Sequence, residues 1–252
     1  MSSCLVIQHV APERCFAIGD ALENAGIDID VCRVYADDRL PERLGDQFAG
    51  LVVMGGPMSA TDDKGFATRA DEIRLLAEAL EIGLPALGVC LGAQLLAVAA
   101  GGRVFPGSKG PEIGWAPIQL TAAAADDPLF VTAPSDFTVL HWHGDTYETP
   151  AGAVHLATSE RYPQQAFRTG ANAWGLQFHL EVDESAVGEF LRVFGADAFA
   201  AGTTPAALRA ATPGAVGVLA RHRDELLGRF AAIVARRPPT LRDPVDELAD
   251  LS

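Results

Sequence analysis

The chain has 252 residues, of which 49% are hydrophobic and 21% are charged, a balance that excludes disordered and fibrous proteins. It has 19 Lys and Arg against 33 Asp and Glu, which gives a formal net charge of −14. A surface this acidic repels phosphate backbones and anionic lipids, so we expect no nucleic acid and no membrane as partner. The four cysteines are scattered, which indicates a reducing compartment, the cytoplasm.

The first hundred residues alternate between strand and helix patterns. Short apolar runs predict strands at Cys4–Gln8, Ile29–Tyr35, Leu51–Met54 and Ala86–Val89. Amphipathic spacing predicts helices at Glu13–Asn24, Arg69–Ile82 and Ala93–Ala100. This alternation predicts an α/β fold, in which an open, largely parallel sheet is flanked by helices in flavodoxin-like layers.

After Arg103 the pattern changes to strand-like stretches separated by turns. Strands are predicted at Ile118–Thr121, Thr138–Leu140, Ala153–Thr158, Gln165–Arg168 and Ala173–Phe178. A helix should follow at Glu184–Phe194, then a loose connection over Gly195–Gly217 with at most a short helix. The last expected elements are an amphipathic helix at Val218–Val234 and an extended surface strap from Arg236 onward.

The strongest chemical signal is Gly88-Val89-Cys90-Leu91-Gly92-Ala93-Gln94, between a predicted strand and a predicted helix. Glycines two positions before and after Cys90 permit a sharp elbow, because strand and helix nearly touch there. The elbow would expose the sulfur at the helix N-terminus, where the dipole favours thiolate over thiol. The alternative is a buried core cysteine between turn glycines.

A second signal is Gln177-Phe178-His179-Leu180-Glu181, at the end of the last predicted strand. Residues two apart on a strand project to the same side, so the Glu181 carboxylate can approach the His179 ring. It would fix the imidazole tautomer while the other ring nitrogen serves a thiol as base. Alone, the pair also fits a surface strand; together with Cys90 it predicts a Cys–His–Glu triad.

A third signal is Met54-Gly55-Gly56-Pro57, directly after a buried strand. Acyl transfer needs backbone donors aimed at a developing oxyanion, and a glycine loop brings an N–H close with no side chain in the way. We expect the N–H groups of Gly56 and Leu91 to form this pair. The alternative is a plain turn that ends the strand.

These motifs, with Glu112-Ile113-Gly114-Trp115 and Trp142-His143-Gly144-Asp145, resemble the class I (triad) glutamine amidotransferases. They are most similar to stand-alone members related to the amidotransferase domain of GMP synthase, over roughly Cys4 to Phe194. Leu180 stands where many members have proline. The resemblance implies these roles: Cys90 as nucleophile, His179 as base, Glu181 as its orienting residue, Gly56 and Leu91 as oxyanion donors, and Gln94 with the backbone near His143 and Gly144 as substrate contacts.

The implied reaction is attack of the Cys90 thiolate on the γ-carbonyl of glutamine or a γ-glutamyl compound, followed by hydrolysis of the thioester. It needs no cofactor and no metal. Three functions stay open: a free-standing hydrolase, a glutaminase subunit that feeds ammonia to a separate synthase, or a non-catalytic binding protein. Neither an S-G-G-x-D-S nor a G-x-x-x-x-G-K-[ST] nucleotide loop occurs, which excludes GMP synthase itself and slightly favours the hydrolase.

The expected domain organisation follows the extent of the resemblance. Residues 1–196 should form the catalytic domain, and residues 197–252 an appendage of linker, helix and strap. The appended helix packs on its own domain or, in the sharper alternative, forms the face of a homodimer. His141 and His143 could be read as a metal pair, but no third ligand is close in sequence. His9 should line the pocket or end the first strand.

Overall fold

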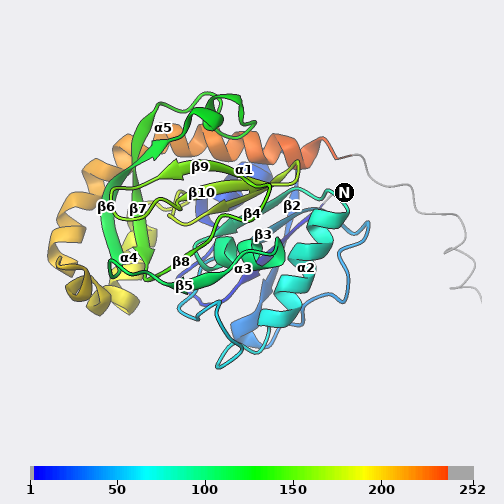
Figure 1. Cartoon of the computed structure of the whole chain (residues 1–252), viewed down its shortest axis with the longest axis horizontal. Helices are drawn as coiled ribbons and strands as arrows, with labels where there is room; N and C mark the ends of the chain where they lie inside the picture. Colours follow the sequence, from blue (N-terminus) through cyan, green and yellow to red (C-terminus); the bar gives the residue numbers. More distant parts are fainter. Residues whose placement is uncertain (1–2, 238–252) are drawn as a thin grey trace, which may run out of the picture.

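The computed structural model describes residues 3–237. Nine strands form one sheet in the order β2-β1-β3-β4-β11-β10-β9-β6-β7 (Figure 1). Pairing is parallel from β2 to β11 and antiparallel from β11 to β7. The strands are β1 (Ser3–Gln8), β2 (Asp28–Arg33), β3 (Phe48–Val53), β4 (Ala86–Val89), β6 (Glu112–Leu120), β7 (Asp136–His143), β9 (Val154–Thr158), β10 (Ala166–Thr169) and β11 (Ala173–Leu176). β5 (Val104–Pro106) and β8 (Asp145–Tyr147) form a separate two-stranded sheet.

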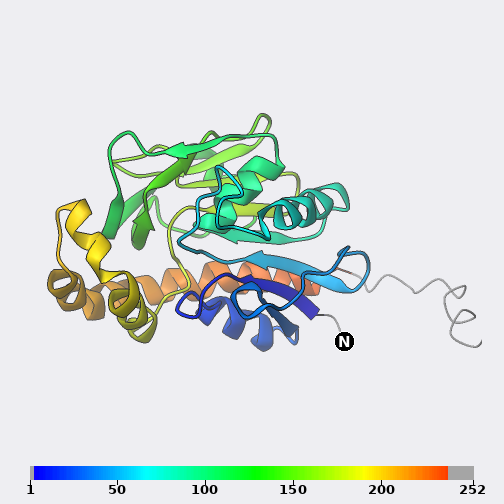
Figure 2. The ribbon, with the colours of Figure 1, turned by 90° about the horizontal axis from the view of Figure 1, so that it is seen from below.

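Helices cover both faces of the large sheet, so the predicted α/β fold is confirmed. α1 (Phe16–Asn24) and α5 (Pro205–Ala235) lie on one face, and α2 (Arg69–Glu81) and α3 (Leu91–Ala99) on the other (Figure 2). α4 (Glu184–Phe194) packs beside α5. Each face has its own cluster of buried apolar side chains. No helix within residues 3–237 is long and apolar enough to cross a membrane.

Two predicted boundaries are wrong in ways that matter for the site. The first helix begins at Phe16 rather than Glu13, because Glu13 lies in a turn where its N–H donates to the Val10 carbonyl. β6 begins at Glu112, six residues before the predicted strand. Pro117 lies inside β6, in the part that pairs with β7 alone, and a proline is tolerated in a strand where one side needs no partner.

The segment over Gly195–Gly217 is more helical than expected. A 3₁₀ helix, η3 (Gly195–Ala201), precedes α5, which runs unbroken through Pro213. Thr204 caps α5 by accepting a hydrogen bond from the N–H of Ala207. Beside the proline, Thr212 accepts a hydrogen bond from the Trp115 indole of β6 at 3.2 Å. Tertiary contacts therefore hold a helix through residues that the sequence pattern marks as a break.

α5 packs against its own chain through a row of buried residues, among them Leu219, Leu226 and Phe230. Its neighbours are α1, α4 and β7. The expected surface strap lies outside the described residues, apart from Arg236 and Arg237. Loops that follow β1, β3, β4 and β11 meet at the carboxyl edge of the parallel strands, which is where ligands bind in open α/β sheets.

Candidate active site

Cys90 stands on a strained turn between β4 and α3. Its φ of 51° and ψ of −103° are rare for a residue with a side chain, and they match a nucleophile elbow. A Cβ atom on Gly88 would overlap with the backbone of Gly92, and one on Gly92 would overlap with the Val53 carbonyl. The glycine spacing predicted from the sequence is therefore a packing requirement of this turn.

His179 and Glu181 meet as predicted. They follow β11, and His179 forms an isolated bridge with Leu140, whose carbonyl accepts a hydrogen bond from the N–H of His179. The Nδ1 atom of His179 lies 2.8 Å from Oε1 of Glu181, and both side chains are buried. Phe190 of α4 packs its ring against the His179 ring, edge to face, with centroids 5.1 Å apart. The imidazole is thus fixed by a carboxylate on one side and an aromatic ring on another.

The electrostatics favour a proton on His179. Burial alone would lower the pKa of His179, but the Glu181 carboxylate and the Cys90 sulfur raise it well above its ordinary value. Burial raises the pKa of the Cys90 thiol, and His179 opposes this rise. The prediction that the elbow exposes the sulfur is wrong, because Cys90 is buried, and this burial opposes the thiolate form that the helix N-terminus was expected to favour. His179 is therefore the neighbour that lowers the pKa of the Cys90 thiol against the effect of burial.

The glycine loop after β3 is held by His9 rather than being a plain turn. The ring of His9 is buried, with Nδ1 2.9 Å from the Gly55 carbonyl and Nε2 2.7 Å from Glu72. Burial lowers the pKa of His9, but the contacts with Glu72 and Gly55 raise it above its ordinary value. His9 thus ends the strand and supports the loop; it does not line the cavity.

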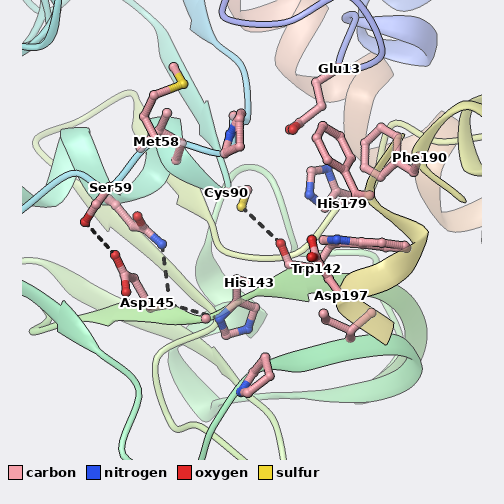
Figure 3. Close-up of a pocket in the computed structure, with 18 of the residues that line it drawn as sticks. Glu13, Met58, Ser59, Cys90, Trp142, His143, Asp145, His179, Phe190 and Asp197 are labelled. Carbon is pink, nitrogen blue, oxygen red and sulfur yellow. Dashed lines mark hydrogen bonds between the residues drawn. The ribbon is translucent and has the colours of Figure 1, made fainter. Parts of the chain in front are cut away.

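A cavity of about 480 Å³ opens in front of Cys90 (Figure 3). Leu91 is the first residue of α3, so its N–H has no partner within the helix. The amide of Gln94 donates to Gln177 at 3.2 Å and to the Asp145 carbonyl at 3.4 Å. Glu181 contacts His179 but does not line the cavity. The other seven of the eight predicted site residues do: Gly56, Cys90, Leu91, Gln94, His143, Gly144 and His179.

Comparison with known proteins identifies the family. A family model described as class I glutamine amidotransferase matches residues 16–194. The chain belongs to the class I glutamine amidotransferases. It is 38% identical over 169 residues to the glutamine amidotransferase-like protein YfeJ of Salmonella typhimurium, a match that covers 66% of this chain and 70% of YfeJ.

The amidotransferase is also similar to part of a longer enzyme and to two solved structures. It is 37% identical over 171 residues to the glutamine-hydrolyzing GMP synthase of Porphyromonas gingivalis. This match covers 65% of this chain but only 32% of the synthase. A solved glutamine amidotransferase from Thermotoga maritima superimposes with a TM-score of 0.82 at 30% identity, covering 91% of this chain and 98% of that one. Another, from Methylobacillus flagellatus, has a TM-score of 0.83 at 28% identity and covers 96% and 99%.

Beside the cavity the amidotransferase has a buried Glu–His–His cluster, in which Glu112 is the third group that the sequence spacing of His141 and His143 did not reveal. Antiparallel pairing of β6 with β7 brings Glu112 opposite His143. One ligand atom each from Glu112, His141 and His143 lie within 4.8 Å of one another, so the three could hold a metal ion. Ser159 and Gln165 also donate to the Glu112 carboxylate, each at 2.8 Å. Hydrogen bonds from neighbouring side chains therefore account for this carboxylate without an ion.

Glu13, Ser59 and Asp145 also line the cavity, and sequence reasoning gave none of them a role. Ser59 donates to the Asp145 carboxylate at 2.8 Å. Asp145 belongs to a motif of the family resemblance and could have been found there. Glu13 had no such signal, because the helical pattern extends back over it.

Proposed function

We propose that this chain is a cysteine-dependent glutamine amidotransferase or amidohydrolase that cleaves the γ-amide of glutamine or of a γ-glutamyl compound. The observation that supports this best is the meeting of Cys90, His179 and Glu181 at one cavity, with the glycine loop and the N-terminus of α3 beside the sulfur. Cys90 is the nucleophile, His179 carries the proton, and Glu181 orients the ring.

The reaction proceeds in two halves. As the Cys90 sulfur attacks the γ-carbonyl carbon, its proton passes to His179, and the N–H groups of Gly56 and Leu91 stabilise the oxyanion. The C–N bond then breaks, and His179 gives the proton to the leaving amine. In the second half His179 takes a proton from water and the hydroxide attacks the thioester carbon. The C–S bond then breaks, the proton returns from His179 to the Cys90 sulfur, and glutamate leaves.

The glutamyl group lies on the side of the cavity where Gln94 ends. Gln94 is held by Gln177 and the Asp145 carbonyl, so its side chain has a fixed direction toward the substrate. The backbone at His143 and Gly144 faces the same space, while the His143 ring is engaged by Glu112 and the Asp145 carbonyl. The ring therefore holds the loop, and the backbone contacts the amino-acid end of the substrate.

A glutaminase subunit that supplies ammonia to a separate synthase is the second candidate. The similarity to about a third of a GMP synthase favours it, because the matched region of that protein is joined to further sequence. A protein that binds a γ-glutamyl ligand without turning it over is the third. The cavity combines nucleophile, base and oxyanion donors, which favours turnover over binding alone, and we carry the free-standing hydrolase forward as the first candidate.

Release of ammonia and of glutamate, measured separately, tests the proposal. The purified chain should hydrolyse glutamine or a member of a panel of γ-glutamyl amides, and Cys90→Ala should abolish this. Cys15→Ala, a control thiol that does not line the cavity, should retain activity. Turnover that appears only when a synthase is added would support the subunit. Binding without turnover under either condition would leave the binding protein.

A further inference from the structure

Glu13 is a buried carboxyl that faces the reaction centre. It comes from the turn after β1, its residue is 6% exposed, and it lines the cavity together with Cys90 and His179. Among the described residues, no side-chain hydrogen bond to its carboxyl group is found; only its backbone N–H is engaged, by Val10. A buried carboxylate without a donor is costly unless something else supplies one.

The chain around Glu13 leaves room for the carboxylate at this place. A Cβ atom on Gly55 would overlap with the Glu13 carboxylate and would lie 3.2 Å from Cε1 of His179. Glycine at position 55 therefore leaves the space that the Glu13 carboxylate occupies, near Cε1 of His179, the ring carbon between the two nitrogens. One of those nitrogens is bound by Glu181, and the other serves Cys90.

This position corresponds to the leaving group. Figure 3 shows Glu13 and Asp145 on opposite sides of Cys90, with His179 on the Glu13 side. Gln94 and Gly144 lie with Asp145, where the glutamyl group is placed under the proposed function. The amine that leaves the γ-carbon takes its proton from His179, so it departs on the side where Glu13 is.

We propose, resting on the proposed function, that Glu13 forms a leaving-group subsite that binds the released amine in its protonated form, as ammonium or a primary alkylammonium ion. The balance is simple. His179 passes the Cys90 proton to the nitrogen as the C–N bond breaks, and the neutral amine takes one further proton from water or from Glu13 itself. The cation then donates N–H bonds to the carboxylate.

Two properties of the site fit this role. Burial raises the pKa of Glu13 to about 7, with Glu181 adding to the rise and His179 and His9 opposing it, so the carboxyl can be charged or neutral near neutral pH. Cys90 is a further titratable group in the same cavity. A cation held by a carboxylate is also not a nucleophile, whereas a synthase needs neutral ammonia. The subsite therefore favours hydrolysis over ammonia transfer.

The test measures amine binding without turnover. Methylammonium chloride is titrated into the full chain and followed by saturation-transfer NMR at constant ionic strength, with tetramethylammonium, which has no N–H, as control ligand. Glu13→Gln should weaken methylammonium binding by about tenfold, the size expected for a charged hydrogen bond. Asp20→Asn, which removes the same charge from an exposed position on α1, should leave it unchanged. Cys90→Ala should bind methylammonium as the wild type does, which separates the amine subsite from the proposed hydrolysis.

A second measurement guards against a variant that does not fold. Methylammonium affinity of the wild type should rise as the pH increases through about 7, where Glu13 ionises, and Glu13→Asp should retain binding. If methylammonium does not bind but ammonium inhibits glutamine turnover in a Glu13-dependent way, the subsite accepts ammonia alone. The proposal would be overturned if methylammonium and ammonium each acted equally on wild type and Glu13→Gln, and if the methylammonium affinity of the wild type did not change with pH.

Discussion

Replacing Glu181 with glutamine removes the charge that faces His179 and keeps the shape of the side chain. The 2.8 Å contact joins two buried groups, so its hydrogen bond is charge-assisted and shielded from water. Hydrogen bonds of this kind contribute about 1.5–3 kcal/mol. Loss of that stabilisation where the imidazolium forms lowers kcat/KM by about 10- to 150-fold.

The assay is glutamate release as a function of pH, with thermal unfolding measured beside it. Because Glu181 raises the pKa of His179, the pH at which His179 loses its proton should fall in Glu181→Gln. Glu184→Gln, an exposed carboxylate in the first turn of α4, is the matched control and should keep wild-type kinetics. A folded Glu181→Gln within about twofold of wild type at every pH would refute the assigned role.

Three further predictions follow from packing and charge. A glutamine-mimicking electrophile should label Cys90 alone, as shown by peptide mapping, because no other cysteine lines the described cavity; labelling of a second thiol at the same rate would contradict this. In denaturant titrations, Gly92→Ala should lower the free energy of unfolding by about 1–3 kcal/mol, because the added Cβ overlaps with Val53. The control Gly217→Ala, which has open space around it in α5, should raise the free energy of unfolding by about 0.5–1 kcal/mol. Equal effects of the two variants would be evidence against the elbow packing. The pKa of His9 is raised in the folded state, so protonated His9 contributes its full stabilisation below its unfolded pKa of ~6.5 and loses it as the pH rises through the folded pKa. The difference in free energy of unfolding between wild type and His9→Gln should therefore shrink as the pH rises. A difference that does not depend on pH would count against the His9–Glu72 pair.

The parts of the site that depend on local geometry could be predicted from the sequence. The elbow around Cys90 needs glycines at fixed positions, and His179 and Glu181 are only two residues apart. Their presence together on one chain is what predicts that they form a triad. Propensity and short-range spacing are enough for such features because few long-range contacts decide them.

Features fixed by long-range contacts could not be predicted in this way. Glu112 meets His143 only through the register of β6 with β7, and Glu13 reaches the cavity only because its turn precedes α1 rather than belonging to it. α5 continues through Pro213 because Trp115 and the core hold the helix on both sides of the proline. In each case tertiary packing overrides the local pattern.

The central claim is that Cys90 forms a γ-glutamyl thioester. The most direct measurement is rapid acid quenching of the full chain during turnover of glutamine or the best γ-glutamyl amide, followed by mass spectrometry of its peptides. The account predicts a glutamyl adduct on the peptide that contains Cys90, accumulating when water attack is slowed and absent from Cys90→Ala. Glutamate release with no adduct on Cys90, or undiminished release by Cys90→Ala, would contradict it.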